Sequence, residues 1–167
     1  MVANSKFLRA GLYMASRLNW QCHRFDGFSL AGLYEMLRLR DQVFVLEQQS
    51  IYGDLDNLDQ SAWHVCGRDA QGMLRAYARL LAPGDKYPDA VAITRVVVDP
   101  ALRGQGVGQA LMAESLRQAT LLFPACTLKL SAQIAAQGLY QSFGFVVASP
   151  PYDDGGILHC DMTRAPA

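Results

Sequence analysis

The order of hydrophobic and polar positions along the chain predicts a sheet of strands. Residues 20–24 alternate like an edge strand, and two apolar runs, 63–67 and 73–81, are joined by a hairpin-like loop. Residues 90–98 are almost continuously apolar, which is typical of a central strand that is covered on both sides. These segments therefore indicate a sheet built partly from adjacent hairpin strands.

Two long helices are predicted from apolar positions with helical spacing. Ser29 is a good N-cap for the first helix, whose apolar positions keep helical spacing from Leu30 to Phe44. The second helix runs from about Val107 to Leu122 and is apolar on more than one side, as expected for a helix packed on a sheet. Together with the strands, these helices predict a mixed α+β fold with helices on both faces of one sheet.

Length and composition predict one domain. The chain has 167 residues, of which 51% are hydrophobic, and we expect a sizeable core within residues 20–167. Residues 1–19 are expected to form an N-terminal extension, in part without fixed structure. The apolar stretch there is interrupted by Ser16 and Arg17, so it is too short for a signal peptide or a membrane span.

Charge and cysteine content narrow the expected partners and compartment. The 15 basic and 15 acidic residues give a formal net charge of zero, so we expect no nucleic acid and no membrane as partner. The four cysteines lie tens of residues apart and form no Cys-x-x-Cys pair. We therefore expect free thiols and a cytoplasmic location.

The segment after the central strand has the character of an anion site. It reads Val96, Val97, Val98, Asp99, Pro100, Ala101, Leu102, Arg103, Gly104, Gln105, Gly106, Val107 and Gly108. A glycine-rich turn between a strand and a helix directs several backbone N–H groups, and the positive end of the helix dipole, to one place. We therefore expect a phosphate group to bind over Arg103–Gly108.

Residue spacing disfavours other phosphate and metal sites. A P-loop needs Lys followed by Ser or Thr, and a dinucleotide-binding loop needs a small residue where Leu111 stands. The aspartates 54, 56 and 59 suggest calcium, but a calcium loop needs an oxygen ligand at Leu58 and glycine at Asp59. We expect no metal site.

Two motifs in fixed order carry a family resemblance. Arg103-x-x-Gly106-x-Gly108 resembles the pyrophosphate loop of the GNAT superfamily of N-acetyltransferases. Downstream, a short strand is expected at Leu128–Leu130, then a turn at Ser131–Gln133, then a helix that closes with Tyr140-x-x-Phe-Gly-Phe, as in that family. Further matches narrow the resemblance to the ElaA-like subfamily: Leu39-Arg40, Val43-Phe44-Val45, Glu47-Gln48, Tyr52, Asp54, Asp56, His64, Arg95-Val96, Gln133, His159 and Met162.

The resemblance implies the GNAT fold and its chemistry. This fold has a mostly antiparallel, twisted sheet of six to seven strands, splayed at strands 4 and 5 and flanked by helices. The implied activity is transfer of an acetyl group from acetyl-CoA, the co-substrate, to a small-molecule amine or a peptide amine. An alternative of a different class is a GNAT-like domain that binds an acyl-CoA as a sensor or structural ligand without turnover.

The resemblance also assigns roles to residues. Tyr140 is the expected general acid, which protonates the departing thiolate. The backbone of Val96, Val97 and Val98 is expected to meet the thioester oxygen at a strand bulge, and Gln133 to bind the coenzyme. The coenzyme loop comprises Arg103, Gly104, Gln105, Gly106, Val107 and Gly108.

The general base has three candidates. Glu47 ranks first because it follows the first helix near the expected acceptor entrance, and His64 and His159 follow because histidine titrates near neutral pH. The nearby aspartate loop either attracts a cationic acceptor or is a solvated turn. An exposed edge strand near the C-terminus is a candidate surface for a homodimer.

Overall fold

The computed structural model describes residues 18–50 and 52–166. The strands are β1 Asn19–Arg24, β2 Trp63–Arg68, β3 Leu74–Leu81, β4 Ala90–Val98, β5 Thr127–Gln133, β6 Val146–Val147, β7 Tyr152–Asp154 and β8 Ile157–Arg164. The helices are α2 Leu30–Arg40, the π-helix η2 Asp41–Glu47, α3 Val107–Leu122 and α4 Gln137–Gln141, with 3₁₀ turns η1 Phe25–Gly27, η3 Pro100–Leu102 and η4 Ile134–Ala136. Residues 1–17, where most of the predicted N-terminal extension falls, lie outside the described residues.

The strands form one mixed sheet in the order β1-β2-β3-β4-β5-β8-β6, with β7 paired to β8. The pair β4–β5 is parallel, and the other neighbouring pairs are antiparallel. The predicted mostly antiparallel α+β fold is therefore confirmed. The sheet has eight strands in the described part of the chain, one more than the expected upper number, because the short strands β6 and β7 both pair with β8.

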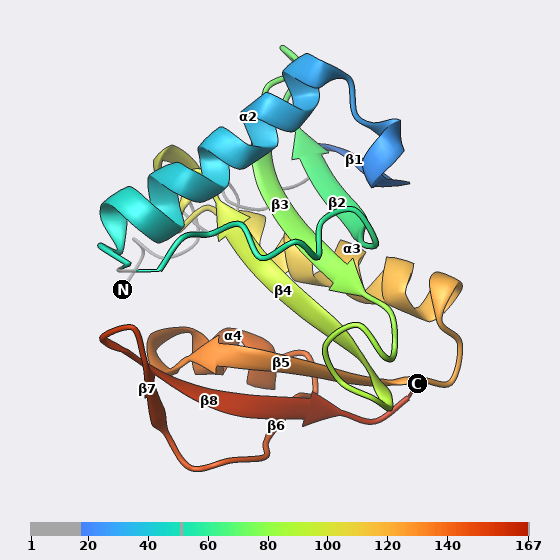
Figure 1. Cartoon of the computed structure of the whole chain (residues 1–167), viewed down its shortest axis with the longest axis vertical. Helices are drawn as coiled ribbons and strands as arrows, with labels where there is room; N and C mark the ends of the chain where they lie inside the picture. The colour runs from blue at the N-terminus through green and yellow to red at the C-terminus, as the bar shows by residue number, and fades with distance from the viewer. Residues whose placement is uncertain (1–17, 51, 167) are drawn as a thin grey trace, which may run out of the picture.

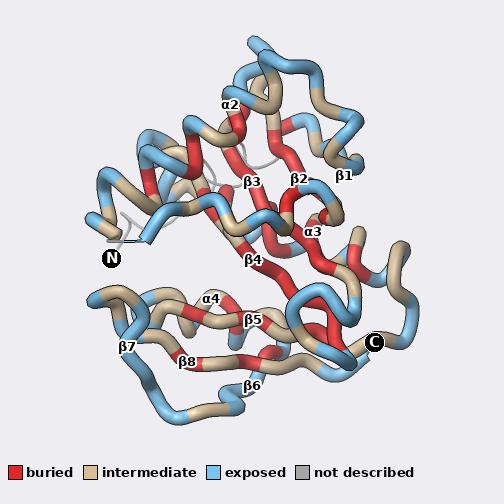
Figure 2. The backbone as a smooth tube through the Cα atoms, viewed as in Figure 1, coloured by how far each residue is buried: buried red, intermediate tan, exposed pale blue. Residues whose placement is uncertain are grey.

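The two long helices cover opposite faces of the sheet (Figure 1). Val65 of β2 packs in the cluster that includes α3, whereas the next residue, Cys66, packs in the cluster that includes α2. This follows from strand geometry, in which successive side chains point to opposite faces. Figure 2 shows the resulting buried positions concentrated on β2, β3 and β4.

Strands β4 and β5 separate soon after they begin. They pair only at Ala90–Ala92 and Thr127–Lys129, and they diverge toward their C-terminal ends (Figure 1). The predicted splay is thereby confirmed. Beyond Ala92, the side of β4 that faces β5 has no partner strand in the register of the described sheet.

The prediction of a turn at Ser131–Gln133 is wrong. These residues continue β5, and Gln133 pairs with His159 of β8. Polar Ser131 and Gln133 suggested a turn, but they alternate with the buried Leu130 and Ala132, as a strand with one covered face should. The partner strand β8, almost thirty residues away in sequence, makes the extension possible.

The N-terminus of α2 follows a local sequence rule. The Ser29 hydroxyl accepts a hydrogen bond from the N–H of Gly32 and so caps α2, as predicted.

No helix within residues 18–50 or 52–166 is both long enough and apolar enough to span a bilayer. At the edge of the sheet, β6 exposes Val146 and Val147, and the homodimer stays a prediction.

Candidate active site

A cavity of about 550 Å³ lies where β4 and β5 diverge. Its walls come from η2, the segment 50–54, β4, β5 with α4, and the β7–β8 hairpin. The sequence-predicted residues that line it are Glu47, Val96, Val97, Val98, Arg103, Gln133, Tyr140 and His159. Most of the predicted site residues therefore meet at one place, although they come from segments far apart in the sequence.

Three contacts join neighbouring walls of this cavity. Arg103 forms an ion pair with Glu47, and the side-chain N–H of Gln133 donates to the side-chain oxygen of Gln48 at 3.0 Å. The ring of Tyr52 packs against Gly155 at the tip of the β7–β8 hairpin, where a Cβ atom would lie 3.4 Å from the ring. The contacts with η2 and the segment after it therefore hold the walls together.

Strand β4 contains a bulge where it lines the cavity. Thr94 pairs with Arg79 and Val97 with Tyr77, so β4 has one more residue than β3 in this interval. Arg95, inside the bulge, has a φ of +54°, which is uncommon for a residue with a side chain. Bulges of this kind bend a strand and redirect its backbone groups. The bulge was expected at Val96–Val98, and the structure has it slightly earlier, at residues 95–96.

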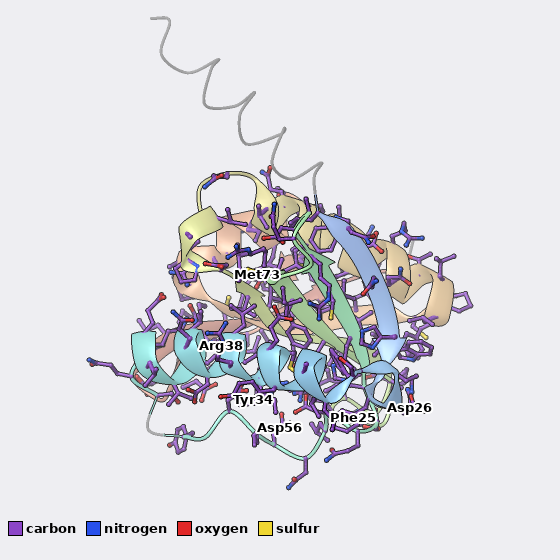
Figure 3. All side chains as sticks on the ribbon, turned by 90° about the horizontal axis from the view of Figure 1, so that it is seen from above. Phe25, Asp26, Tyr34, Arg38, Asp56 and Met73 are labelled. Atoms are coloured by element: carbon purple, nitrogen blue, oxygen red, sulfur yellow. The ribbon has the colours of Figure 1, made fainter. Side chains whose placement is uncertain are left out.

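A buried network of charges lies directly behind the bulge. Its side chains are Arg40 of α2, Arg79 of β3, Arg95 of β4, and Asp54, Asp56 and Asp59 of the connecting segment. The guanidinium groups of Arg40 and Arg79 are fully buried, and Asp59 accepts from both at 2.7 and 2.8 Å. Figure 3 shows Asp56 on the segment that runs beside α2. Three positive and three negative charges balance in this network.

Both expectations for the aspartate loop are therefore wrong. Burial alone would raise the pKa of Asp59, but hydrogen bonds and charge from Arg40 and Arg79 outweigh it and hold that pKa below its ordinary value. Asp54 and Asp59 are neither solvated nor free to attract a cationic acceptor. Sequence reasoning missed the network because the arginines lie on three different elements, 14 to 41 residues away from their partners. Within residues 18–50 and 52–166, no group of His, Cys, Asp and Glu has a geometry that could hold a metal.

The predicted coenzyme loop has open backbone donors. Gly104 and Gly106 adopt left-handed φ values of +72° and +77°, which glycine tolerates without a Cβ clash. Gly106 is the N-cap of α3, and the N–H of Ala110 is the first to bond back to its carbonyl. Among the hydrogen bonds of the described residues, none is donated by the N–H groups of residues 104–108. Such a row of donors at a helix start is suited to bind phosphate.

Tyr140 lies at the inner wall of the cavity. Its ring is buried and packs edge-on against Phe145 at 6.2 Å between centroids. No hydrogen bond of its hydroxyl is found within the described residues, although the side chain borders the cavity. Burial raises the pKa of Tyr140 to about 12, so the phenol keeps its proton at neutral pH.

His64 lies outside the cavity, in the core. Its Nδ1 is 2.8 Å from the Tyr77 hydroxyl, and its Nε2 is 3.0 Å from the carbonyl oxygen of Asp59. Burial lowers the pKa of His64 to about 4, and the neighbouring carbonyl and charge of Asp59 offset only part of this effect. Both ring nitrogens are therefore engaged in structural hydrogen bonds.

His159 borders the cavity and has a different arrangement. Its Nδ1 donates to the carbonyl oxygen of Ile157 at 2.8 Å, which leaves Nε2 as the acceptor nitrogen of the neutral ring. The ring of Tyr152 stacks on His159, and the Tyr152 hydroxyl bonds to both Ser131 and Asp161. Ser131 lines the cavity, and Tyr152 contacts both Ser131 and His159; sequence reasoning singled out neither Ser131 nor Tyr152 as a functional residue.

A splayed sheet with a donor-rich loop before α3 is the arrangement of an acyl-CoA-dependent acyltransferase. The profile of the acetyltransferase (GNAT) domain family matches residues 38–165, and the chain belongs to this family. It is therefore a transferase, and the family resemblance seen in the sequence is confirmed.

Several known proteins are similar over nearly the whole chain. Protein ElaA of Escherichia coli is 39% identical over 149 residues, which cover 88% of this chain and 96% of ElaA. A UPF0039 protein of Synechocystis is 40% identical over 145 residues, which cover 87% of this chain and 94% of that protein. Among solved structures, an acyl-CoA N-acyltransferase from Pseudomonas aeruginosa aligns with a TM-score of 0.83 at 39% identity, covering 89% of this chain and 99% of that one. The crystal structure of E. coli ElaA aligns with a TM-score of 0.82, covering 88% of this chain and 99% of the ElaA chain.

Proposed function

We propose that this protein transfers the acetyl group of acetyl-CoA to an amine of a small molecule or peptide, by direct attack in the cavity between β4 and β5. The observation that carries the proposal is that Tyr140, the unpaired edge of β4 and Arg103, which directly precedes the open donors of residues 104–108, all border this one cavity. Family membership supports acyl transfer in general. The acetyl group and the amine acceptor are the finer part of the proposal.

The first task of the chain is to hold and polarise the thioester. Backbone N–H groups of residues 104–108 bind the pyrophosphate, and the cleft beside β4 receives the pantetheine arm. A backbone N–H in Val96–Val98 donates to the thioester oxygen, where negative charge develops during attack. Gln133, fixed by its bond to Gln48, contacts the coenzyme from β5.

Proton transfers accompany the attack and the departure of the thiolate. The acceptor nitrogen forms a bond to the carbonyl carbon and loses a proton to a base, after which the C–S bond breaks and the sulfur takes a proton from Tyr140. We assign His159 as the base, because Nε2 is its free nitrogen while Nδ1 is held by Ile157. His64 ranks lower because both its nitrogens are bonded, and Glu47 because Arg103 occupies its carboxylate.

Release of free thiol tests the function directly. Purified protein is incubated with acetyl-CoA and a panel of polyamines, aminoglycosides, amino acids and peptides, and free CoA is measured. The proposal predicts release that depends on one class of amine and requires Tyr140. Tight binding of acetyl-CoA without release for any amine would contradict turnover and favour the alternative, an acyl-CoA sensor.

A further inference from the structure

We propose that Asp54 positions the β4 bulge by holding Arg95 in its left-handed conformation. The inference rests on the proposed function, in which the bulge supplies the N–H for the thioester oxygen. Asp54 lies at the rear wall of the cavity and is almost completely buried there. Its role in this account is to orient backbone, so it is a positioning residue and makes no contact with the reacting atoms.

The side chain of Arg95 is bound almost entirely to one residue. Its Nε donates to Oδ1 of Asp54 at 2.6 Å, and its Nη2 donates to the Asp54 carbonyl oxygen at 2.7 Å. A longer bond of 3.2 Å joins Nη2 to Asp56. A residue with a Cβ atom disfavours a φ of +54°, so these bonds offset a conformation that the backbone alone would leave.

Asp54 is fixed in turn by the helix behind it. The other carboxylate oxygen, Oδ2, accepts a bond of 2.6 Å from Nε of Arg40, whose side chain is fully buried. Arg40 also binds Asp59, which Arg79 holds from β3. One carboxylate therefore connects a rigid position on α2 to the strained residue of β4.

The bulge decides which way the neighbouring backbone points. Val96 follows Arg95 directly and borders the cavity, while Val97 resumes pairing with Tyr77 of β3. If Arg95 relaxes to an extended φ, β4 loses its extra residue against β3 and its register beyond Thr94 changes. The N–H that serves the thioester would then no longer point into the cavity.

Two single substitutions of Arg95, to alanine and to glycine, separate its role in the backbone conformation of the bulge from a role of its side chain in binding. Arg95→Ala removes the ion pairs but keeps the Cβ atom that disfavours a left-handed φ, whereas Arg95→Gly removes the ion pairs and the conformational penalty together. The readouts are kcat for thiol release and the ratio of Kd for CoA to Kd for acetyl-CoA, because only acetyl-CoA carries the oxygen that the bulge binds. These two ligands also test the site without any acceptor.

The proposal predicts that Arg95→Ala lowers kcat roughly 100-fold, the scale for loss of one oxyanion donor, and reduces the preference for acetyl-CoA. Arg95→Gly should recover at least tenfold in kcat over Arg95→Ala and restore the preference. Asp54→Asn should resemble Arg95→Ala while binding CoA as the native protein does.

Equal activity of the Ala and Gly variants would overturn the proposal. An increase in the KM for the acceptor that is equal in the Ala and Gly variants would also overturn it, because it would mean that the Arg95 side chain contacts the acceptor. If the native protein binds acetyl-CoA without releasing thiol, the proposed catalytic function is refuted independently of the role of Arg95. The ratio of the Kd values for CoA and acetyl-CoA still decides that role. Equal ratios in the Ala and Gly variants would then refute it.

Discussion

The guanidinium of Arg103 donates to both carboxylate oxygens of Glu47, with N–O distances of 2.6 and 3.0 Å. This pair joins the coenzyme loop to the end of η2, and both side chains are partly exposed to solvent. In the proposed function, the same guanidinium lies beside the pyrophosphate. Glu47 therefore competes with the coenzyme for Arg103.

Removal of the Glu47 charge should strengthen coenzyme binding. An exposed ion pair contributes about 0 to 1 kcal/mol, so Glu47→Gln should lower the Kd for CoA by up to about fivefold. Arg103→Gln should raise that Kd, and the dependence of affinity on salt should weaken with it. Calorimetry at two salt concentrations measures both effects. If Glu47→Gln instead lowers kcat by about 100-fold or more at unchanged affinity, Glu47 is the base and His159 is not.

A side chain at Gly106 should abolish coenzyme binding. Gly106→Val forces a Cβ atom onto a residue with φ of +77°, at the point where backbone must approach phosphate. Gly84→Val is a matched control, because Gly84 has φ of +98°, free space around it, and a place before β4 instead of after it. We expect similar losses of thermal stability in the two variants and loss of CoA affinity only in Gly106→Val. Equal affinity in both folded variants would remove the loop from the site.

Gly108 offers a milder substitution at the same loop. A Cβ atom there meets only Leu139 at 3.8 Å and Val98 at 4.0 Å, which are ordinary contact distances. Gly108→Ala should therefore fold with nearly unchanged stability. Weaker CoA binding by this variant, measured by calorimetry, would report close approach of the coenzyme, whereas unchanged binding would limit the essential glycines to the first part of the loop.

The buried His64 should make the fold sensitive to mild acid. Its pKa is about 4 in the folded protein and near 6.5 when unfolded, so only the unfolded state takes up a proton between these values. The free energy of unfolding should fall by up to about 3 kcal/mol as pH decreases from 6.5 to 4. The pKa values of Asp56 and Asp59 are lowered in the folded protein, so these carboxylates stabilise the fold above about pH 4. Their contribution to stability is lost only in stronger acid, below the window in which His64 acts.

Urea unfolding between pH 4 and 7 measures this effect. His64→Gln should be less stable at pH 7, since it disrupts the bonds to Tyr77 and Asp59, but should show a flatter dependence on pH. A slope identical to that of the native protein would show that another group is responsible for the acid sensitivity.

Local sequence signals predicted much of the fold. The Ser29 cap, the hairpin of β2 and β3, the apolar β4 and the glycine turn before α3 each depend on nearby residues, and the structure contains all four. The extension of β5 to Gln133 depends on pairing with β8, which no local pattern reveals.

The candidate site likewise has parts that local sequence predicts and parts that depend on residues distant in the sequence. Tyr140 and the loop residues belong to contiguous motifs and could therefore be proposed from the sequence, and their roles stay predictions. The charge network was misread, because the aspartates of one segment resemble a solvated loop until Arg40, Arg79 and Arg95 arrive from three other elements. His64 and His159 are equivalent as residue types, and only the burial of His64 and its second hydrogen bond, from Nε2 to the carbonyl oxygen of Asp59, separate them.

The central claim is that this cavity catalyses acyl transfer with Tyr140 as its acid, and Tyr140→Phe tests it most directly. The substitution removes one hydroxyl and keeps the ring that packs against Phe145. We predict a decrease in kcat of roughly ten- to ten-thousand-fold, with Kd for CoA nearly unchanged. Tyr140→Ala is the control for packing, since it leaves a cavity and should also lower stability.

The decisive measurement is therefore the steady-state rate of thiol release by Tyr140→Phe, made with the acceptor that the amine panel identifies and paired with calorimetric titration of CoA. The account predicts a large loss of turnover at native coenzyme affinity. A rate within about twofold of the native protein would contradict it, because a tyrosine that only packs loses nothing when its hydroxyl is removed.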